Sequence, residues 1–347
     1  MSFKKNWFYF VFIVMLFNTC AKEYKEEVPD VSDINVKVEL QRFEKDLFSI
    51  DTNSLSSGLT ALEEKYPDFS TIFFENVVSS KNPRVAPEGH EAFMKGFLSF
   101  PAIRHLYDTC MVIYDDMSVQ EEEFEQAFKY FKHYFPDKEE PDITTFISEY
   151  GYAAFIYGDN SLAVGLDFYL GADYPYFQYN QGHPSFSNYL TRTFTPEHLA
   201  TKALKPLVED LCGDEPATGR LLDIMVHNGK KLYIIDHLFP YTADSIKLEM
   251  TQTQVAWLKD NEYDMWAFFL SEDLLYSTDW GLIKKYVAPS PNSPGMPEEA
   301  PGRTANWLGW QIVKKYMRLN PQTTMYELIE LRDAQVVLER SKYKPRR

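Results

Sequence analysis

The sequence predicts an α+β fold that is mainly helical, with a small, mostly antiparallel sheet in the middle of the chain. Runs of β-branched and aromatic residues fill positions 144–169, and Gly151 and Gly158-Asp159-Asn160 interrupt them as hairpin turns do. On both sides of these runs, apolar residues recur at helical spacing. No internal repeat or strong linker divides the body, so we expect one globular domain over residues 36–335.

The elements before the sheet follow from local patterns. Apolar residues alternate over 36–40, which predicts a first short strand, and helical spacing follows in two pieces over 42–66. A further helical pattern covers 90–116. Ser118 and Glu121 have the spacing of a capping box, and they open an amphipathic helix that Pro136 stops.

The elements after the sheet are predicted to be helical. Thr195-Pro196 has the pattern of an N-cap followed by a first helical residue, and it opens a helix to about residue 211. The remaining predicted helices cover 219–236, 251–270, 306–319 and 324–332, with a proline-rich loop at 288–302.

The N-terminus is typical of an exported lipoprotein. Two lysines precede eleven apolar residues, Trp7 to Phe17, a run shorter than the roughly 20 residues that span a membrane. Asn18-Thr19-Cys20 follows and resembles a lipobox, with Phe17 where the pattern prefers an aliphatic residue. We therefore expect a signal peptide at 1–19, an acylated Cys20, a flexible tether over 20–35, and a lipid-anchored place in the cell envelope, in the outer membrane.

Composition limits the partners. The net charge is −16, which repels nucleic acid and argues against a DNA or RNA partner. A basic C-terminal tail at 336–347 is expected to be a solvated terminus. Apart from Cys20, only Cys110 and Cys212 are present, and their apolar surroundings favour two buried free thiols over a disulfide bond.

Several motifs in order resemble the gliding-motility lipoprotein GldB family. They are Gly165 to Gly171 (GLDFYLG), Leu221-Leu222-Asp223, Asn228 to Tyr233 (NGKKLY) and Gly302 to Trp310 (GRTANWLGW), together with the lipobox and Arg42-Phe43. The resemblance covers most of residues 36–335. It implies an envelope lipoprotein of the gliding-motility apparatus, whose partners are the membrane, through the lipid anchor, and envelope or motility proteins.

GldB-like proteins are in turn similar to predicted zincin-like, zinc-dependent proteases, which implies a zincin-like fold. A zincin helix carries two histidines at i and i+4 with a glutamate after the first, and a second helix supplies a third ligand. The best match here retains only His198, with Lys202 in place of the second histidine and Asn228 in place of the carboxylate. We therefore expect no catalytic residue, no metal and no cofactor, and a degenerate cleft that binds a partner, for example by strand addition.

Two alternatives remain open. His198 and His227, with His237 as an additional candidate, offer an unusual ligand set for a metal-dependent hydrolase. Tyr176, Phe177 and Tyr179 lie in an aromatic loop that suits a surface glycan or an extended peptide, although the sequence favours packing of this loop against its own domain. Arg303 is expected to pair with an acid such as Asp167 or Asp173.

Overall fold

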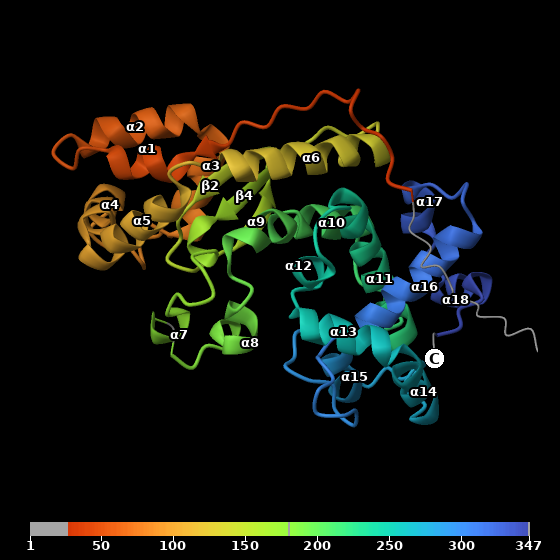
Figure 1. Cartoon of the computed structure of the whole chain (residues 1–347). Coiled ribbons are helices and arrows are strands. Elements are labelled where there is room, and N and C mark those ends of the chain that lie inside the picture. Colours follow the sequence, from red (N-terminus) through yellow and green to blue (C-terminus); the bar gives the residue numbers. More distant parts are fainter. Residues whose placement is uncertain (1–26, 180, 346–347) are drawn as a thin grey trace, which may run out of the picture.

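The computed structural model describes residues 27–179 and 181–345, and Figure 1 shows their arrangement. The predicted signal peptide and Cys20 lie outside these residues, so lipidation stays a prediction. A small sheet lies near the centre, under the long helix α6. The helices α1 to α5 gather on one side of it, and the C-terminal part of the chain forms a larger group of helices on the other side. The prediction of a mainly helical α+β fold is confirmed.

The sheet has four strands in the order β1-β2-β4-β3. Strands β3 (Ala154–Tyr157) and β4 (Ser161–Gly165) form the predicted antiparallel hairpin. The prediction of a mostly antiparallel sheet is wrong, because β2 (Asp142–Phe146) pairs in parallel with β4 and with β1 (Gln41–Arg42). A turn signal predicts only the pairing of strands that are neighbours in sequence. The parallel pairs join strands that are not neighbours: the helices α1 to α6 lie between β1 and β2, and β3 lies between β2 and β4, so no local pattern indicates these pairs.

The alternating segment 36–40 forms no strand in the described structure. Val36 and Leu40 are buried against the core, which accounts for the alternation. Helix α6 supplies the partners that a neighbouring strand would have supplied. The backbone N–H of Val38 donates to the Glu125 carboxylate (3.2 Å), and that of Leu40 donates to the Glu121 carboxylate (3.5 Å).

The N-terminal helices follow the predicted pattern with three differences, of which one is an additional helix over residues 67–72. The helical stretch 90–116 is broken at Phe100, because Pro101 begins a new helix. The predicted capping box at Ser118 does not form: Ser118 is the first helical residue, and the Asp116 carboxylate accepts its N–H (2.9 Å). The helices are α1 (Phe43–Ser49), α2 (Leu55–Lys65), α3 (Pro67–Ile72), α4 (His90–Ser99), α5 (Pro101–Tyr114) and α6 (Ser118–Tyr134).

An aromatic cluster, defined here as Phe43, Phe69, Phe73 and Phe146, joins these helices to the sheet. Phe43 stands 4.8 Å, centroid to centroid, from both Phe69 and Phe73, and Phe146 of β2 lies 5.5 Å from Phe69. All four side chains are fully buried. Rings in such tilted and edge-to-face arrangements fill a large volume and attract one another.

The C-terminal part is helical, and it is built around two long helices, α11 (Leu221–Leu238) and α16 (Thr304–Leu319). A Cβ at Gly229 would overlap the backbone of Gly309, and a Cβ at Gly309 would overlap the Met225 carbonyl. The two backbones therefore touch where they cross. The other helices are α7 (Tyr176–Tyr179), α8 (Asn188–Thr191), α9 (Pro196–Ala203), α10 (Lys205–Cys212), α12 (Asp244–Leu248), α13 (Gln252–Asp260), α14 (Glu262–Ser271), α15 (Trp280–Val287), α17 (Met325–Glu330) and α18 (Ala334–Ser341).

Both ends of the packed body extend beyond the predicted limits of 36 and 335. Val31, inside the predicted tether, is buried in the core. Part of the predicted basic tail forms α18, which packs on α16 and buries Val337, and the Tyr343 hydroxyl donates to Glu262 (2.7 Å). Cys110 and Cys212 are buried free thiols, as predicted. Within residues 27–179 and 181–345, no helix is long and apolar enough to cross a bilayer.

Candidate functional site

His198 is a buried, neutral histidine at the start of α9. Pro196 is the first helical residue, Thr195 precedes it as predicted, and the Thr195 hydroxyl lies 2.7 Å from His198 Nδ1. Burial, helped by the charges of Lys202 and Lys205, lowers the pKa of His198 to about 4. One ring nitrogen thus has a local partner at the helix terminus.

Lys202 lies one turn further along α9 and is held on three sides. Its ammonium sits 4.5 Å from the centre of the Phe194 ring, donates to the Thr193 hydroxyl (3.2 Å) and lies 3.7 Å from the Glu249 carboxylate. Burial, and then the nearby charge of Arg303, lowers the pKa of Lys202 to about 7. The position of a second zincin histidine is therefore occupied by an amine with its own set of partners.

Asn228 contacts α16 and not the residues that surround Lys202. Its side-chain N–H donates to Asn306 Oδ1 on α16 (3.0 Å), and Asn306 in turn donates to the Val287 carbonyl (2.8 Å). The next residue is Gly229, where α11 touches α16. The Asn228-Gly229 step and the Asn306 to Gly309 stretch are thus two sides of one helix crossing, which accounts structurally for two of the motifs noted in the sequence.

The other two histidines of the alternative metal site both lie on α11. His227 is buried, and burial, helped by Lys231 and Lys230, lowers its pKa to about 4. His237 Nδ1 lies 2.8 Å from the Tyr233 carbonyl within the same helix. Among the described residues, no three His, Cys, Asp or Glu side chains are grouped so that they could hold a metal ion.

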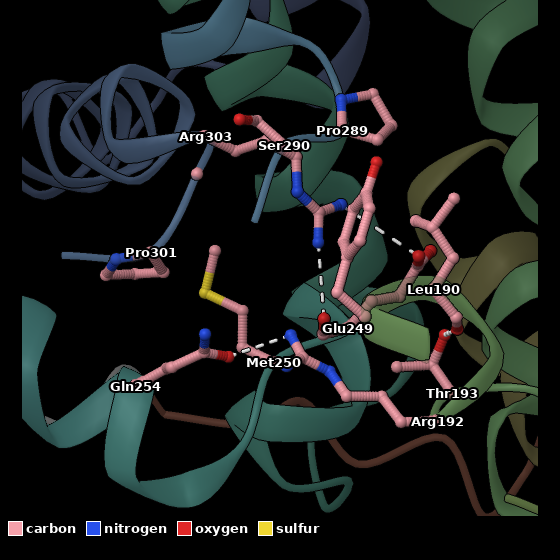
Figure 2. Close-up of a pocket in the computed structure, with 12 residues that line it drawn as sticks. Leu190, Arg192, Thr193, Glu249, Met250, Gln254, Pro289, Ser290, Pro301 and Arg303 are labelled. Carbon is pink, nitrogen blue, oxygen red and sulfur yellow. Dashed lines mark hydrogen bonds and ion pairs between the residues drawn. The ribbon is translucent and has the colours of Figure 1, made fainter. Parts of the chain in front are cut away.

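A basic hollow lies beside Lys202, and Figure 2 shows its lining. Its enclosed volume is about 10 Å³, roughly the space of one water molecule, and it is partly open to solvent. Three segments that are distant in sequence form it: the end of α8, the turn between α12 and α13, and the proline-rich loop 288–302 with Arg303. Its walls are formed by Tyr189, Leu190, Arg192, Thr193, Glu249, Met250, Gln254, Pro289, Ser290, Pro301, Gly302 and Arg303.

Glu249 is the acidic centre of this hollow. It follows α12 with a left-handed backbone (φ 54°), and its carboxylate contacts the Lys205 ammonium. It also lies 3.7 Å from Lys202 and 3.9 Å from Arg303. Glu249 and Arg192 are not predicted from the sequence, because no local pattern indicates a positive φ at a glutamate or a contact between segments so far apart.

The Gly302-Arg303 step places one guanidinium in the hollow. A Cβ at Gly302 would overlap the Ser290 carbonyl, and Arg303 has a φ of 62°, so the chain turns tightly before α16. The Arg303 guanidinium donates to the carbonyls of Leu248 (2.9 Å) and Glu249 (3.2 Å). Arg303 lies against an acid, as predicted, but that acid is Glu249 (3.9 Å) and not Asp167 or Asp173, because this turn directs the side chain to the end of α12.

Asp167, from the GLDFYLG motif, has a structural position instead. Its carboxylate is fully buried and accepts the backbone N–H groups of Ser148 (3.1 Å) and Tyr150 (2.6 Å). Glu149 and Tyr150 both have positive φ, so this carboxylate holds a turn that the backbone alone disfavours. Burial raises the pKa of Asp167 to about 6, against the lowering effect of these hydrogen bonds.

The predicted aromatic binding trio is divided. Tyr176 is fully buried, and its hydroxyl accepts the Leu170 N–H (2.8 Å), so it is not available to a ligand. Phe177 and Tyr179 are 52% and 53% exposed, and Tyr179 stacks on Tyr174 at 5.8 Å. The loop therefore belongs partly to the core and partly to the surface.

With this geometry established, the comparisons with known proteins decide the family. The family described as "Gliding motility protein GldB" matches residues 24–345. The chain belongs to the GldB family. Membership indicates a gliding-motility lipoprotein of the cell envelope, with partners in the motility apparatus. No curated protein and no solved structure matched the chain. The similarity of this GldB-family chain to zincin-like proteases stays a prediction.

Proposed function

We propose that this GldB-family chain is a non-enzymatic envelope lipoprotein that binds a protein of the motility apparatus at the basic hollow. The placement of Lys202 carries the proposal. A zincin needs a second neutral imidazole at this position. Here an amine is held against Phe194, Thr193 and Glu249, with Arg303 nearby, and such a cationic neighbourhood disfavours a divalent metal.

The residues that would complete a hydrolase site also support the proposal. The residue after His198 is Leu199, a buried aliphatic side chain that has no group to accept a proton from water. The Asn228 amide is engaged by Asn306 on α16. Neither position supplies the general base or the anionic ligand that metal-assisted hydrolysis requires.

The hollow itself supports partner binding. It combines charged groups, hydroxyl groups and the apolar Leu190 and Met250 in one concave surface. Concave sites with a few convergent polar groups are the usual places where proteins bind ligands or partner side chains. Because the whole chain has a net charge of −16, this basic hollow is also a local exception that distinguishes one face from the rest.

The absence of enzyme activity is tested by His198→Gln in a gliding bacterium that carries this protein. A glutamine keeps a polar group opposite Thr195 but removes the imidazole that a metal would need. We expect cells with this variant to spread on a surface at the wild-type rate, whereas cells without the gene do not. A folded His198→Gln protein, present at normal abundance, that abolishes spreading contradicts the proposal.

Partner binding is tested with a photocrosslinking amino acid in the full-length lipoprotein. We place it at Tyr189, which lines the hollow, and, as a control, at Val112, which is 86% exposed on α5. We expect the photocrosslinking residue at position 189, and not the one at position 112, to crosslink to a protein of the motility apparatus in intact cells. Equal crosslinking from both positions, or none from Tyr189, contradicts the assignment of the hollow.

A further inference from the structure

Four basic side chains gather at the basic hollow, and three of them lie against the Glu249 carboxylate. Lys205 contacts Glu249, and Lys202 and Arg303 lie 3.7 and 3.9 Å from the same carboxylate. The fourth cation, Arg192, donates to the neutral side-chain oxygen of Gln254 (2.9 Å). The Glu249 carboxylate is therefore shared among three basic side chains.

These charges are not simply solvated. The side chains of Lys202, Glu249 and Arg303 are only 13%, 12% and 19% exposed. Arg303 is close enough to lower the pKa values of Arg192 and Lys202, although burial is the larger cause for both. Buried like charges are costly unless an opposite charge or hydrogen-bond acceptors balance them.

Arg192 carries a donor that lacks an acceptor. Its Nε is buried and has no hydrogen-bond partner within the part of the chain that the structure describes. Buried N–H groups without an acceptor are rare in folded proteins, and they commonly mark the place of a ligand or an ordered water. The guanidinium plane of arginine presents Nε and a terminal nitrogen side by side, an arrangement that fits two oxygens of one oxyanion.

The shape of the hollow suits a single small group. Figure 2 shows the Arg192 and Arg303 side chains entering it from opposite walls, with Met250 between them on a third side. Thr193 and Ser290 add hydroxyl groups to the lining. Its enclosed volume of about 10 Å³ holds one water-sized group, so one oxygen of an oxyanion can enter while the rest of that group stays at the open mouth.

We propose that the basic hollow binds one oxyanion group, carboxylate or phosphate, between the guanidinium groups of Arg192 and Arg303. This inference rests on the proposed function, because the oxyanion is the part of the partner that enters the hollow. The oxyanion adds the negative charge that Glu249 alone does not supply, and it accepts the N–H of Arg192 Nε.

The test is a titration of the full-length protein in detergent with sodium phosphate and, separately, with sodium acetate. Sodium chloride keeps the ionic strength constant, and intrinsic fluorescence or calorimetry measures binding. We expect Arg192→Gln to weaken binding about tenfold and Glu249→Gln, which removes the competing carboxylate, to strengthen it about tenfold. Arg84→Gln removes the same charge from an exposed position far along the chain and should leave binding unchanged.

Each outcome decides one question. Binding of phosphate alone indicates that the partner bears a phosphate, and binding of acetate alone indicates that it bears a carboxylate. Either result supports the inference. Binding of neither anion, or equal binding by wild type and a folded Arg192→Gln, overturns it. Arg192→Lys, which keeps the charge but loses the planar pair of donors, should show intermediate affinity and provides a second variant if Arg192→Gln does not fold.

The two proposals fail separately, because this titration contains no partner protein. If only the inference is wrong, the protein binds no anion, but the crosslink from Tyr189 persists in cells. If only the proposed function is wrong, the protein binds an anion, but no crosslink forms from Tyr189.

Discussion

The aromatic cluster and the crossing of α11 with α16 are packed in opposite ways. In the cluster, large rings such as Phe69 and Phe73 fill the space between helices and sheet, and their centroids stay 4.8 Å or more from that of Phe43. At the crossing, Gly229 and Gly309 leave no side chain between the helices, and the backbones themselves touch. The first kind of packing adapts to a change of side chain, and the second does not.

This difference bears on the position of the basic hollow. Arg303 directly precedes α16, and Asn306, one turn later, binds Asn228 of α11. The crossing therefore fixes the start of α16, and with it the guanidinium that enters the hollow. We expect the binding surface to depend more on the glycine crossing than on the aromatic cluster.

The largest effect is expected for Gly309→Ala. Its methyl group would overlap the Met225 carbonyl, which is backbone and cannot rotate away, so α11 and α16 must separate. We expect the free energy of unfolding to fall by at least about 3 kcal/mol in urea titrations. Gly96→Ala is the matched control, because Gly96 is an exposed helical glycine of α4 with open space around its Cβ position.

The control should change stability in the opposite direction. In an exposed helix, alanine is favoured over glycine by about 0.5–1 kcal/mol, so Gly96→Ala should stabilise the protein slightly. A Gly309→Ala protein as stable as wild type would mean that the helices separate easily, and the contrast between the two regions would then be lost.

The second-largest effect is expected from acid, which should lower the free energy of unfolding through His227 of α11. The pKa of His227, in α11, is lowered from 6.5 to about 4 by burial, so the unfolded chain binds more protons than the folded one between these values. Stability that is present above about pH 6.5 is therefore lost as the pH falls towards 4, by about 2–3 kcal/mol for this group. His198, with the same lowered pKa, adds to the loss.

The measurement is the free energy of unfolding between pH 4 and 7 for wild type and His227→Gln. The variant removes the titrating group, so its stability should depend less steeply on pH. The control is His133→Gln, because His133 is exposed on α6 in the N-terminal region. If His133→Gln flattens the profile as much as His227→Gln does, burial of the α11 histidine is not the cause.

Local elements and long-range contacts differ in how far the sequence predicts them. The positions of most helices and the β3–β4 hairpin follow from local spacing and turn residues, since these elements are specified within a few residues. The parallel strand pairs and the partners of Lys202 do not follow. Glu249 and Arg303 reach the hollow through left-handed backbone conformations, and Arg192 comes from a short helix, so only tertiary packing brings them together.

The smallest of these effects is expected in the aromatic cluster, for Phe73→Leu. The side chain is fully buried among rings, with centroids at 4.8 Å for Phe43 and 5.6 Å for Phe74. Leucine keeps an apolar group of similar size and loses mainly the ring contacts, so unfolding should become easier by only about 1.5 kcal/mol. The same urea titration checks this value against Gly309→Ala. One methyl group added at the crossing should then cost more than an aromatic ring replaced in the cluster, because neighbouring side chains can shift to fill a gap, whereas two touching backbones cannot make room.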